Sequence, residues 1–197
     1  MSEIRKLAAI LVADIVGYSR LAGADEDRTL ARLRGLRSDL IDPAIAAHHG
    51  RIVKRTGDGS IVEFRSVVDA VRCAIEVQSG LAERNTGLPS ERRIEFRVGV
   101  HIGDVVEEED GDLMGDGVNI AARLEGIANP GGICLSEDAY RQVRARLEMT
   151  PAIWGRPGSK TSRSSSGSIH SKSGKGLTRT QRLSPQCRKD PSRLASR

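Results

Sequence analysis

The chain has 197 residues, with 31 lysines and arginines against 26 aspartates and glutamates, which gives a formal net charge of +5. A basic chain of this size suggests a nucleic acid or an anionic membrane as its partner. The charge is unevenly spread, however: residues 1–149 hold 20 basic and 25 acidic side chains, whereas residues 150–197 hold 11 basic and one acidic. We therefore expect one core-bearing domain over residues 1–149, followed by a disordered tail rich in Ser, Arg and Lys over residues 150–197.

The composition also argues against membrane insertion and base stacking. The longest apolar run near the N-terminus, Leu7–Ala13, ends at Asp14 after seven residues, which is too short to span a membrane. It lacks the cleavage pattern of an export signal, so we expect no membrane span and a cytoplasmic protein. Only five aromatic residues are present, too few to form a platform for single-stranded nucleic acid.

Apolar periodicity predicts a succession of strands and helices. In chain order these are a strand at Leu7–Val16, a helix at Asp25–His48 kinked by Pro43, strands at Arg51–Thr56 and Ser60–Phe64, a helix from Ser66 to Asn85, a strand at Ile94–Val106, a helix at Val118–Ile127, a strand at Ile133–Leu135 and a helix at Glu137–Leu147. This order predicts an α+β fold, with a ferredoxin-like βαββαβ core and an αβα extension. We expect its helices on one face of a mostly antiparallel sheet.

Two carboxylates are candidate metal ligands. Asp14 lies in an otherwise apolar strand, where an unpaired charge would cost several kcal/mol. Asp58 lies at the tip of a predicted hairpin turn. If the two strands are neighbours, both carboxylates meet at one edge of the sheet, where such oxygen ligands suit Mg²⁺ or Mn²⁺ with a phosphate substrate. Taken alone, Asp58 also fits an ordinary turn, and Asp14 a strand-end cap or a buried salt bridge.

A second candidate group lies on the predicted helix that follows Gly115-Asp116-Gly117. Asn119 and Arg123 are four residues apart, so a helix places them on one face, and the small Ala122 keeps the surface between them low. An amide and a guanidinium side by side can orient a ribose and neutralise a phosphate. An ordinary solvent-exposed helix face is the alternative.

Four segments in order carry a family resemblance. They read ADIVGYS at 13–19, KRTGDG at 54–59, FRVGVH at 96–101 and GDGVNIAAR at 115–123. Together they resemble the catalytic domain of the class III nucleotide cyclases, especially those of the bacterial adenylate cyclases, over about residues 5–149. Each segment alone is a weak signal, whereas four in sequence at the right separations are specific.

The resemblance implies metal and base sites. Asp14 and Asp58 would hold two Mg²⁺ or Mn²⁺ ions per site, with the backbone carbonyl of Ile15 as a further ligand. Lys54 and Asp112 would read the purine. A lysine that donates to adenine N1 and an aspartate that accepts from the adenine amino group favour ATP, whereas guanylate cyclases tend to carry Glu and Cys at these positions.

The same resemblance implies a reaction and a partner. Asn119 would hold the ribose, Arg123 the α-phosphate and Arg97 the terminal phosphates. The implied enzyme is an adenylate cyclase, a phosphorus–oxygen lyase that converts ATP to 3′,5′-cyclic AMP and pyrophosphate by two-metal, in-line attack of the ribose 3′-hydroxyl. In this family the site is completed across a two-fold dimer, so a homodimer is expected, and nucleic acid is not expected as a partner.

The resemblance stops after Met149, where no counterpart of the family's closing C-terminal hairpin is visible. Reading Ala152–Lys172 from the third base of each codon is compatible with the family's Asp-Leu-Gly-Glu and Leu-Lys-Asn-Ile stretches. We hypothesise that the tail is a frameshifted reading of that hairpin; the alternative is a genuine basic tail that binds nucleic acid or anionic lipid. Loss of the hairpin leaves open a second function, a catalytically impaired cyclase-like dimerisation or regulatory module.

Overall fold

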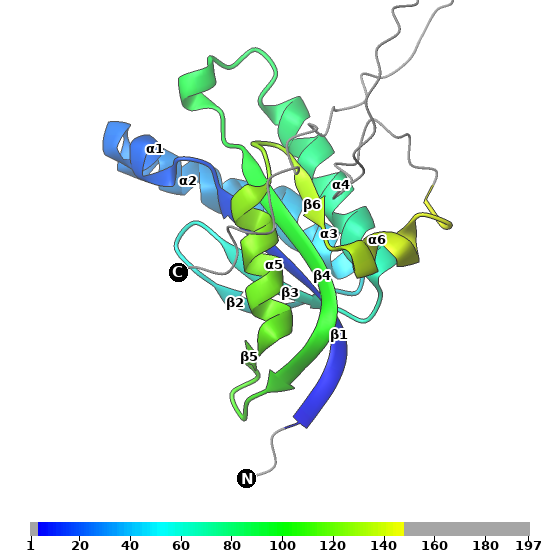
Figure 1. Cartoon of the computed structure of the whole chain (residues 1–197). Helices are drawn as coiled ribbons and strands as arrows, with labels where there is room; N and C mark the ends of the chain where they lie inside the picture. The colour runs from blue at the N-terminus through cyan, green and yellow to red at the C-terminus, as the bar shows by residue number, and fades with distance from the viewer. Residues whose placement is uncertain (1–3, 148–197) are drawn as a thin grey trace, which may run out of the picture.

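A computed structural model describes residues 4–147 (Figure 1). Its elements are β1 (Ile4–Ile15), α1 (Tyr18–Ala24), α2 (Glu26–Leu36), the π-helical turn η1 (Arg37–Ile41), α3 (Asp42–Ala47), β2 (Arg51–Arg55), β3 (Ser60–Phe64), α4 (Val67–Arg84), the 3₁₀ turn η2 (Ser90–Arg92), β4 (Phe96–Glu107), β5 (Leu113–Met114), α5 (Asp116–Ile127), β6 (Ile133–Leu135) and α6 (Glu137–Val143). The predicted tail and its proposed change of reading frame lie outside the described residues.

The described strands form one six-stranded sheet with β1 and β4 near its centre. The order is β2-β3-β1-β4-β5, and β6 pairs in parallel with β4. β1 and β4 run antiparallel along their whole length, from the pair Ile4–Glu107 to the pair Ile15–Phe96. β3 pairs with the other edge of β1, ending at Ala13–Ser60. The carboxyl end of β1 therefore lies between the β2–β3 turn and the start of β4.

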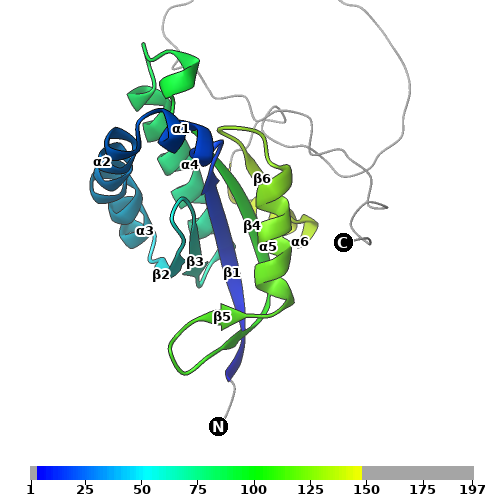
Figure 2. The same cartoon turned by 90° about the vertical axis from the view of Figure 1, so that its left-hand side faces the viewer.

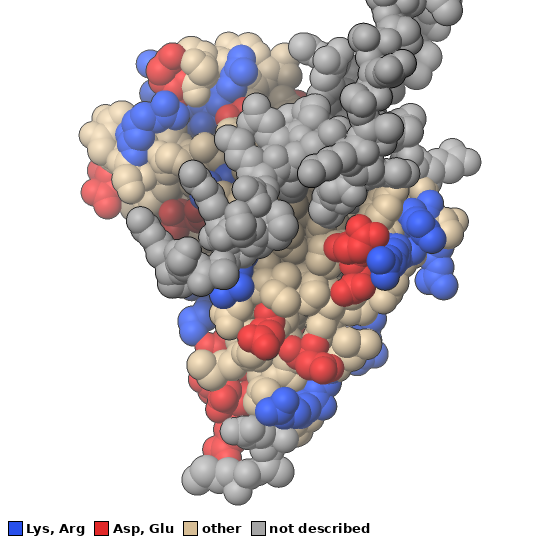
Figure 3. Space-filling model, viewed as in Figure 1, with Lys and Arg blue, Asp and Glu red and all other residues tan. Residues whose placement is uncertain are grey.

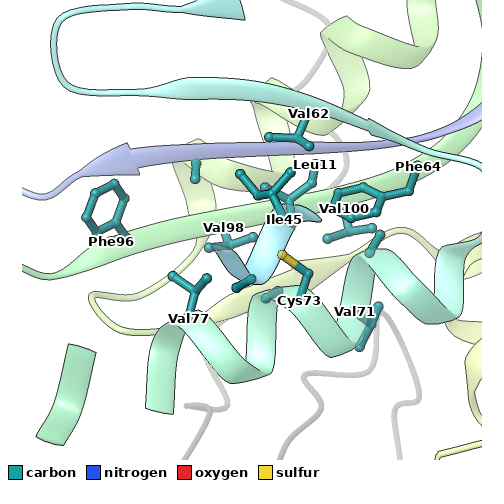
Figure 4. Close-up of a cluster of buried hydrophobic side chains, with 14 of the residues drawn as sticks. Leu11, Ile45, Val62, Phe64, Val71, Cys73, Val77, Phe96, Val98 and Val100 are labelled. Atoms are coloured by element: carbon teal, nitrogen blue, oxygen red, sulfur yellow. The ribbon is translucent and has the colours of Figure 1, made fainter. Parts of the chain in front are cut away.

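Helices cover both faces of this sheet (Figure 2). Alternate residues of β1 enter two separate cores: Leu11 belongs to the larger core with α2, α3, α4 and α6, whereas Ile10 belongs to a smaller core with α5. Figure 4 shows part of the larger core, where Cys73 and Val77 of α4 point toward the sheet. The expectation of helices on one face is thus wrong for α5. The apolar run at the centre of β1 fits a strand buried on both faces.

α5 lies against β4 because Gly99 has no side chain. A Cβ at Gly99 would come within 2.2 Å of the Ala121 carbonyl oxygen and 2.3 Å of the Glu125 backbone nitrogen. A methyl group there would push the helix off the sheet, because both contacts are with backbone. The glycine thereby sets the position of α5, which carries Asn119 and Arg123.

The predicted helix at 25–48 is interrupted. A separate helix, α1, precedes it, and α2 begins after Asp25, whose side chain accepts a hydrogen bond from the backbone N–H of Arg28 at 3.1 Å. Pro43 has no backbone N–H, and its ring clashes with the carbonyl four residues earlier in a regular α-helix. The chain widens into the π-helical turn η1, in which the backbone N–H of Asp42 donates to the Arg37 carbonyl.

The other predicted elements occur close to their expected bounds. Ser66 caps α4 by accepting a hydrogen bond from the backbone N–H of Val68 at 3.2 Å, as its position before the apolar helix predicts. The two-residue strand β5 was not predicted, and α6 ends at Val143 instead of Leu147. None of the helices between residues 4 and 147 is long and apolar enough to cross a membrane.

Candidate active site

The candidate metal site lies where the β2–β3 turn meets the end of β1. Asp14 is the penultimate residue of β1, and Asp58 lies in the turn. A Cβ on Gly59 would lie 2.8 Å from the Ala13 carbonyl oxygen and 3.3 Å from Oδ1 of Asp14, so the turn packs directly against the strand end. The backbone N–H of Gly59 also donates to Oγ1 of Thr56 at 2.9 Å. This close approach brings Asp14 and Asp58 to one edge of the sheet.

The two carboxylates repel each other. Burial raises the pKa of the Asp14 carboxyl, and the charge of Asp58 raises it further, while the guanidinium of Arg97 acts in the opposite direction. A divalent cation between the two carboxylates would relieve this repulsion. In the described part of the chain, no group of three or more His, Cys, Asp and Glu side chains is arranged so that it could hold a metal ion. The available donors are thus two carboxylates and backbone oxygens such as that of Ile15, a set of hard ligands that fits Mg²⁺ or Mn²⁺.

Arg97 is held beside this edge by two carboxylates. It lies opposite Asp14 in the β1–β4 register, and its Nη2 is 3.2 Å from Oδ2 of Asp14. Its Nε is 2.9 Å from Oε1 of Glu125 on α5, whose side chain is only 12% exposed. The sequence analysis missed Glu125, because nothing in the local sequence shows that α5 packs over the start of β4. The pair of carboxylates fixes a guanidinium next to the candidate metal site.

Lys54 and Asp112, the two residues predicted to read the base, contact each other. Nζ of Lys54 on β2 lies 2.5 Å from Oδ2 of Asp112, which directly precedes β5. Oδ1 of Asp112 accepts a hydrogen bond from the backbone N–H of Leu113 at 2.9 Å, so the carboxylate is oriented from two sides. This contact raises the pKa of the Lys54 ammonium and lowers that of the Asp112 carboxyl. Both groups are therefore charged at neutral pH.

A further arginine, which the sequence analysis did not identify, holds the loop that carries Asp112. Nη1 of Arg51 on β2 donates to the Gly111 carbonyl at 2.9 Å, and its Nη2 lies 2.7 Å from Glu63 and 2.9 Å from Glu107. β2 thus contacts this loop twice, through Arg51 and through Lys54. The loop is fixed relative to the strand on which Lys54 lies.

Among the described residues, the predicted group on α5 is not connected to the two carboxylates or to the Lys54–Asp112 pair. Asn119 and Arg123 are exposed on α5, one turn apart as the spacing predicts. Among residues 4–147, no hydrogen bond or ion pair joins either side chain to Asp14, Asp58 or the Lys54–Asp112 pair. Within residues 4–147, the candidate metal group (Asp14 and Asp58), the candidate base-reading pair (Lys54 and Asp112) and the candidate α5 group (Asn119 and Arg123) are therefore not joined to one another by hydrogen bonds or ion pairs.

No surface patch of one charge sign is visible among the described residues on the face of the molecule that carries α5 (Figure 3). On the face shown in Figure 3, where α5 lies in front, acidic and basic side chains are interspersed over the described surface. No patch of a single sign covers the described part of this visible face. The net charge of +5 consequently says little about the ligand of residues 4–147.

The fold is that of a class III nucleotide cyclase domain, with carboxylates at the carboxyl end of β1 and a separate lysine–aspartate pair between β2 and the residue before β5. The chain matches the family of adenylate and guanylate cyclase catalytic domains over residues 2–172, and it belongs to that family.

Similar proteins agree with this assignment. The chain is 48% identical over 145 residues to a candidate adenylate cyclase of Rhizobium meliloti (strain 1021), a match that covers 74% of this chain and 24% of that protein. It is 33% identical to an adenylate cyclase of Streptomyces coelicolor, over 73% of this chain and 36% of the relative. The chain therefore spans well under half the length of these curated relatives.

Solved structures show the same fold. A crystal structure of an adenylate/guanylate cyclase/hydrolase from Silicibacter pomeroyi matches with a TM-score of 0.70 and 46% identity, over 75% of this chain and 85% of that one. The adenylyl cyclase CyaB from P. aeruginosa matches with a TM-score of 0.65 at 21% identity, over 74% of this chain and 84% of that one, which shows the fold alone.

Proposed function

We propose that this chain is an adenylate cyclase that converts ATP to 3′,5′-cyclic AMP and pyrophosphate. The observation that carries the choice of ATP is the contact between Lys54 and Asp112. Adenine presents an acceptor, N1, beside a donor amino group, whereas guanine presents a donor N1–H beside an acceptor oxygen. If the ammonium faces N1 and the carboxylate faces the 6-position, as the family resemblance implies, the pair matches the adenine edge and mismatches that of guanine.

The metal group would serve the phosphates. Two divalent cations held by Asp14, Asp58 and the Ile15 carbonyl would lower the pKa of the ribose 3′-hydroxyl and neutralise negative charge on the phosphates. Arg97, already beside Asp14, would bind the terminal phosphates through its guanidinium. These roles need the carboxylates ionised, so acidification through the raised pKa of Asp14 would weaken the site.

The α5 group would act at the reacting phosphorus. Asn119 would orient the ribose for in-line attack, and Arg123 would offset the charge that develops on the α-phosphoryl oxygens in the transition state. The exposure of both side chains leaves them free to meet a substrate bound to another protomer. We propose a homodimer in which the metal group of one protomer faces the base-reading and α5 groups of its partner, giving two equivalent sites.

We assign this activity to residues 1–149 and the cytoplasm as its location, both as predictions from the sequence. A second candidate function is a catalytically impaired cyclase-like dimerisation or regulatory module. It is favoured by our sequence interpretation that the chain departs from the family's closing hairpin after Met149, although the family match itself extends to residue 172. The two functions differ in whether any cyclic nucleotide is formed.

The deciding experiment incubates the purified full chain with ATP or GTP and Mg²⁺ or Mn²⁺ and measures cyclic nucleotides by chromatography. We expect cyclic AMP from ATP, and a loss of at least about 100-fold in Asp14→Ala, whose circular dichroism should match that of the wild type. No product under any condition would favour the impaired module. Equal product from Asp14→Ala would refute the metal assignment.

Mixing two inactive variants tests the shared site. Asp14→Ala lacks a metal ligand and Arg123→Ala lacks the transition-state cation, so a heterodimer of the two would keep one intact site. Equal mixing should restore about one quarter of the wild-type activity, since about half of the dimers are heterodimers with one site each. Absence of rescue, when the mixed dimer is shown to form, would exclude a site built from two protomers.

A further inference from the structure

The turn that carries Asp58 is held by the helical segment as well as by β1. Nη2 of Arg37 donates to the Gly57 carbonyl at 3.0 Å and approaches the Thr56 carbonyl at 3.4 Å. One residue earlier, Nη2 of Arg55 donates to Oδ1 of Asp42 at 2.7 Å. Three consecutive residues before Asp58 are therefore contacted from η1 and the first residue of α3.

The π-helical turn explains why one helical segment reaches the turn twice. In a regular α-helix, residues five apart point about 140° away from each other around the axis. In η1 the backbone N–H of Asp42 donates to the Arg37 carbonyl, so these two residues lie one above the other. Pro43 causes this widening because it cannot continue the α-helical hydrogen bonds. The proline thereby brings Arg37 and Asp42 to the same side.

Arg37 leaves the Asp58 carboxylate available. Arg37 and Asp58 line the same surface depression, together with Ile41 and Phe96. Across residues 4–147, the Arg37 guanidinium forms no ion pair, and its hydrogen bonds go to backbone carbonyls of the turn. Asp58 likewise has no hydrogen bond or ion pair with the described residues. The Arg37 guanidinium thus holds the backbone just before Asp58 without binding the carboxylate oxygens of Asp58.

The turn is consequently held from two sides. Gly59 packs against the Ala13 carbonyl on the β1 side, and Arg37 binds the Gly57 carbonyl on the helix side. We infer that Arg37 is a positioning residue for the metal-binding turn, which sets the place of the Asp58 carboxylate relative to Asp14 and so the affinity for a divalent cation. This inference rests on the proposed function, because it takes Asp58 as a metal ligand.

The test compares the full-length wild type with Arg37→Ala and Arg37→Lys. Arg34→Ala is the matched control: Arg34 is an exposed arginine at the end of α2 with the same charge, and its side chain forms no hydrogen bond or ion pair with the turn among the described residues. Three quantities are measured without reference to catalysis: the melting temperature, the hydrogen exchange of the turn and the affinity for Mn²⁺. Hydrogen exchange of a peptide spanning residues 55–60 reports the opening of the turn, and electron paramagnetic resonance of free Mn²⁺ reports metal affinity.

We expect Arg37→Ala to exchange faster at residues 55–60 and to bind Mn²⁺ about tenfold more weakly, which is the lower end of the usual effect of a residue that orients a metal ligand. Its melting temperature should stay close to that of Arg34→Ala, which should match the wild type in all three measurements. Arg37→Lys should recover part of the Mn²⁺ affinity, since an ammonium can donate to the Gly57 carbonyl with fewer directed bonds.

Each contrary result overturns a defined part of the inference. Unchanged exchange in Arg37→Ala shows that Arg37 does not hold the turn. Faster exchange with unchanged Mn²⁺ affinity shows that the turn does not set the metal site. Wild-type protein that binds no Mn²⁺ and forms no cyclic nucleotide overturns the proposed function and the metal part of the inference, while hydrogen exchange still decides whether Arg37 fixes the turn.

Discussion

Two glycines of the same turn should respond oppositely to replacement by alanine. A Cβ on Gly59 would lie 2.8 Å from the backbone oxygen of Ala13 and 2.9 Å from Oγ1 of Thr56, whereas a Cβ on Gly57 would meet nothing within 4 Å. Neither glycine has the positive φ that an alanine would resist. The pair separates the effect of space from the effect of backbone conformation.

The expected magnitude follows from the contact distances. Ordinary contacts of a Cβ begin at 3.4 Å and the Ala13 carbonyl oxygen of β1 would be at 2.8 Å, so Gly59→Ala must drive the turn about 0.6 Å away from β1. Overpacking of this kind costs about 1–3 kcal/mol, and each kcal/mol lowers the melting temperature of a chain this long by about 2–4 °C. Gly57→Ala should be neutral or should stabilise by up to about 1 kcal/mol, because alanine reduces the entropy of the unfolded chain.

We expect Gly59→Ala to lower the rate of cyclic AMP formation by more than its loss of folding stability alone would explain. The same displacement moves Asp58 away from Asp14, and misplacement of a catalytic group by this order costs about 10- to 100-fold in rate. The assays are thermal unfolding, Mn²⁺ binding and cyclic AMP formation for both variants. Equal losses in Gly57→Ala and Gly59→Ala, or full Mn²⁺ affinity in Gly59→Ala, would refute the reasoning that close packing of the turn against β1 builds the metal site.

Two further predictions concern the base-reading pair and the pH response. The double variant Lys54→Glu/Asp112→Cys should shift the ratio of kcat/KM for GTP over ATP toward GTP by about 10- to 100-fold. Lys54→Glu alone places two acidic groups together and should lower kcat/KM for both substrates. An unchanged ratio in the double variant would show that the pair does not read the base. Burial and the charge of Asp58 raise the pKa of Asp14, so ionisation of this carboxyl destabilises the folded protein. The loss of stability is absent at pH values below the ordinary pKa of 3.8 and complete at pH values above the raised pKa of the folded protein. The melting temperature of Asp14→Asn relative to the wild type should therefore rise with pH through that window, and Mn²⁺ should then raise the melting temperature of the wild type alone; a pH-independent difference would contradict the stated electrostatics.

Most elements of the fold could be predicted from local signals. The strand at Ile133–Leu135 and the capping of α4 by Ser66 follow from apolar runs and helix-start residues, which act within a few positions. The side of the sheet on which α5 packs could not be predicted. An amphipathic helix can cover either face, and a glycine in the strand, such as Gly99 of β4, does not show from which face a helix approaches. The approach at Gly99 is visible only once the two backbones are packed.

The candidate site divides in the same way. Asp14, Asp58, Lys54 and Asp112 were found because their residue types and spacing match a family pattern, although Lys54 and Asp112 are 58 positions apart. Glu125 and Arg37 were missed, because each acts on a residue from a distant element: Glu125 on Arg97, and Arg37 on the carbonyl of Gly57. Backbone carbonyls carry no sequence signature, so a side chain that binds one cannot be found from a motif.

The amino-acid sequence by itself determined the α+β class, the order of the elements and the residues that could carry cyclase chemistry, because periodicity, capping and motif spacing are local properties of the chain. Only the tertiary structure decided which of these residues meet. β1 runs between β3 and β4, so Asp14 lies beside both the Asp58 turn and Arg97. A strand's neighbours depend on which apolar faces bury each other, and that is settled by packing over the whole sheet.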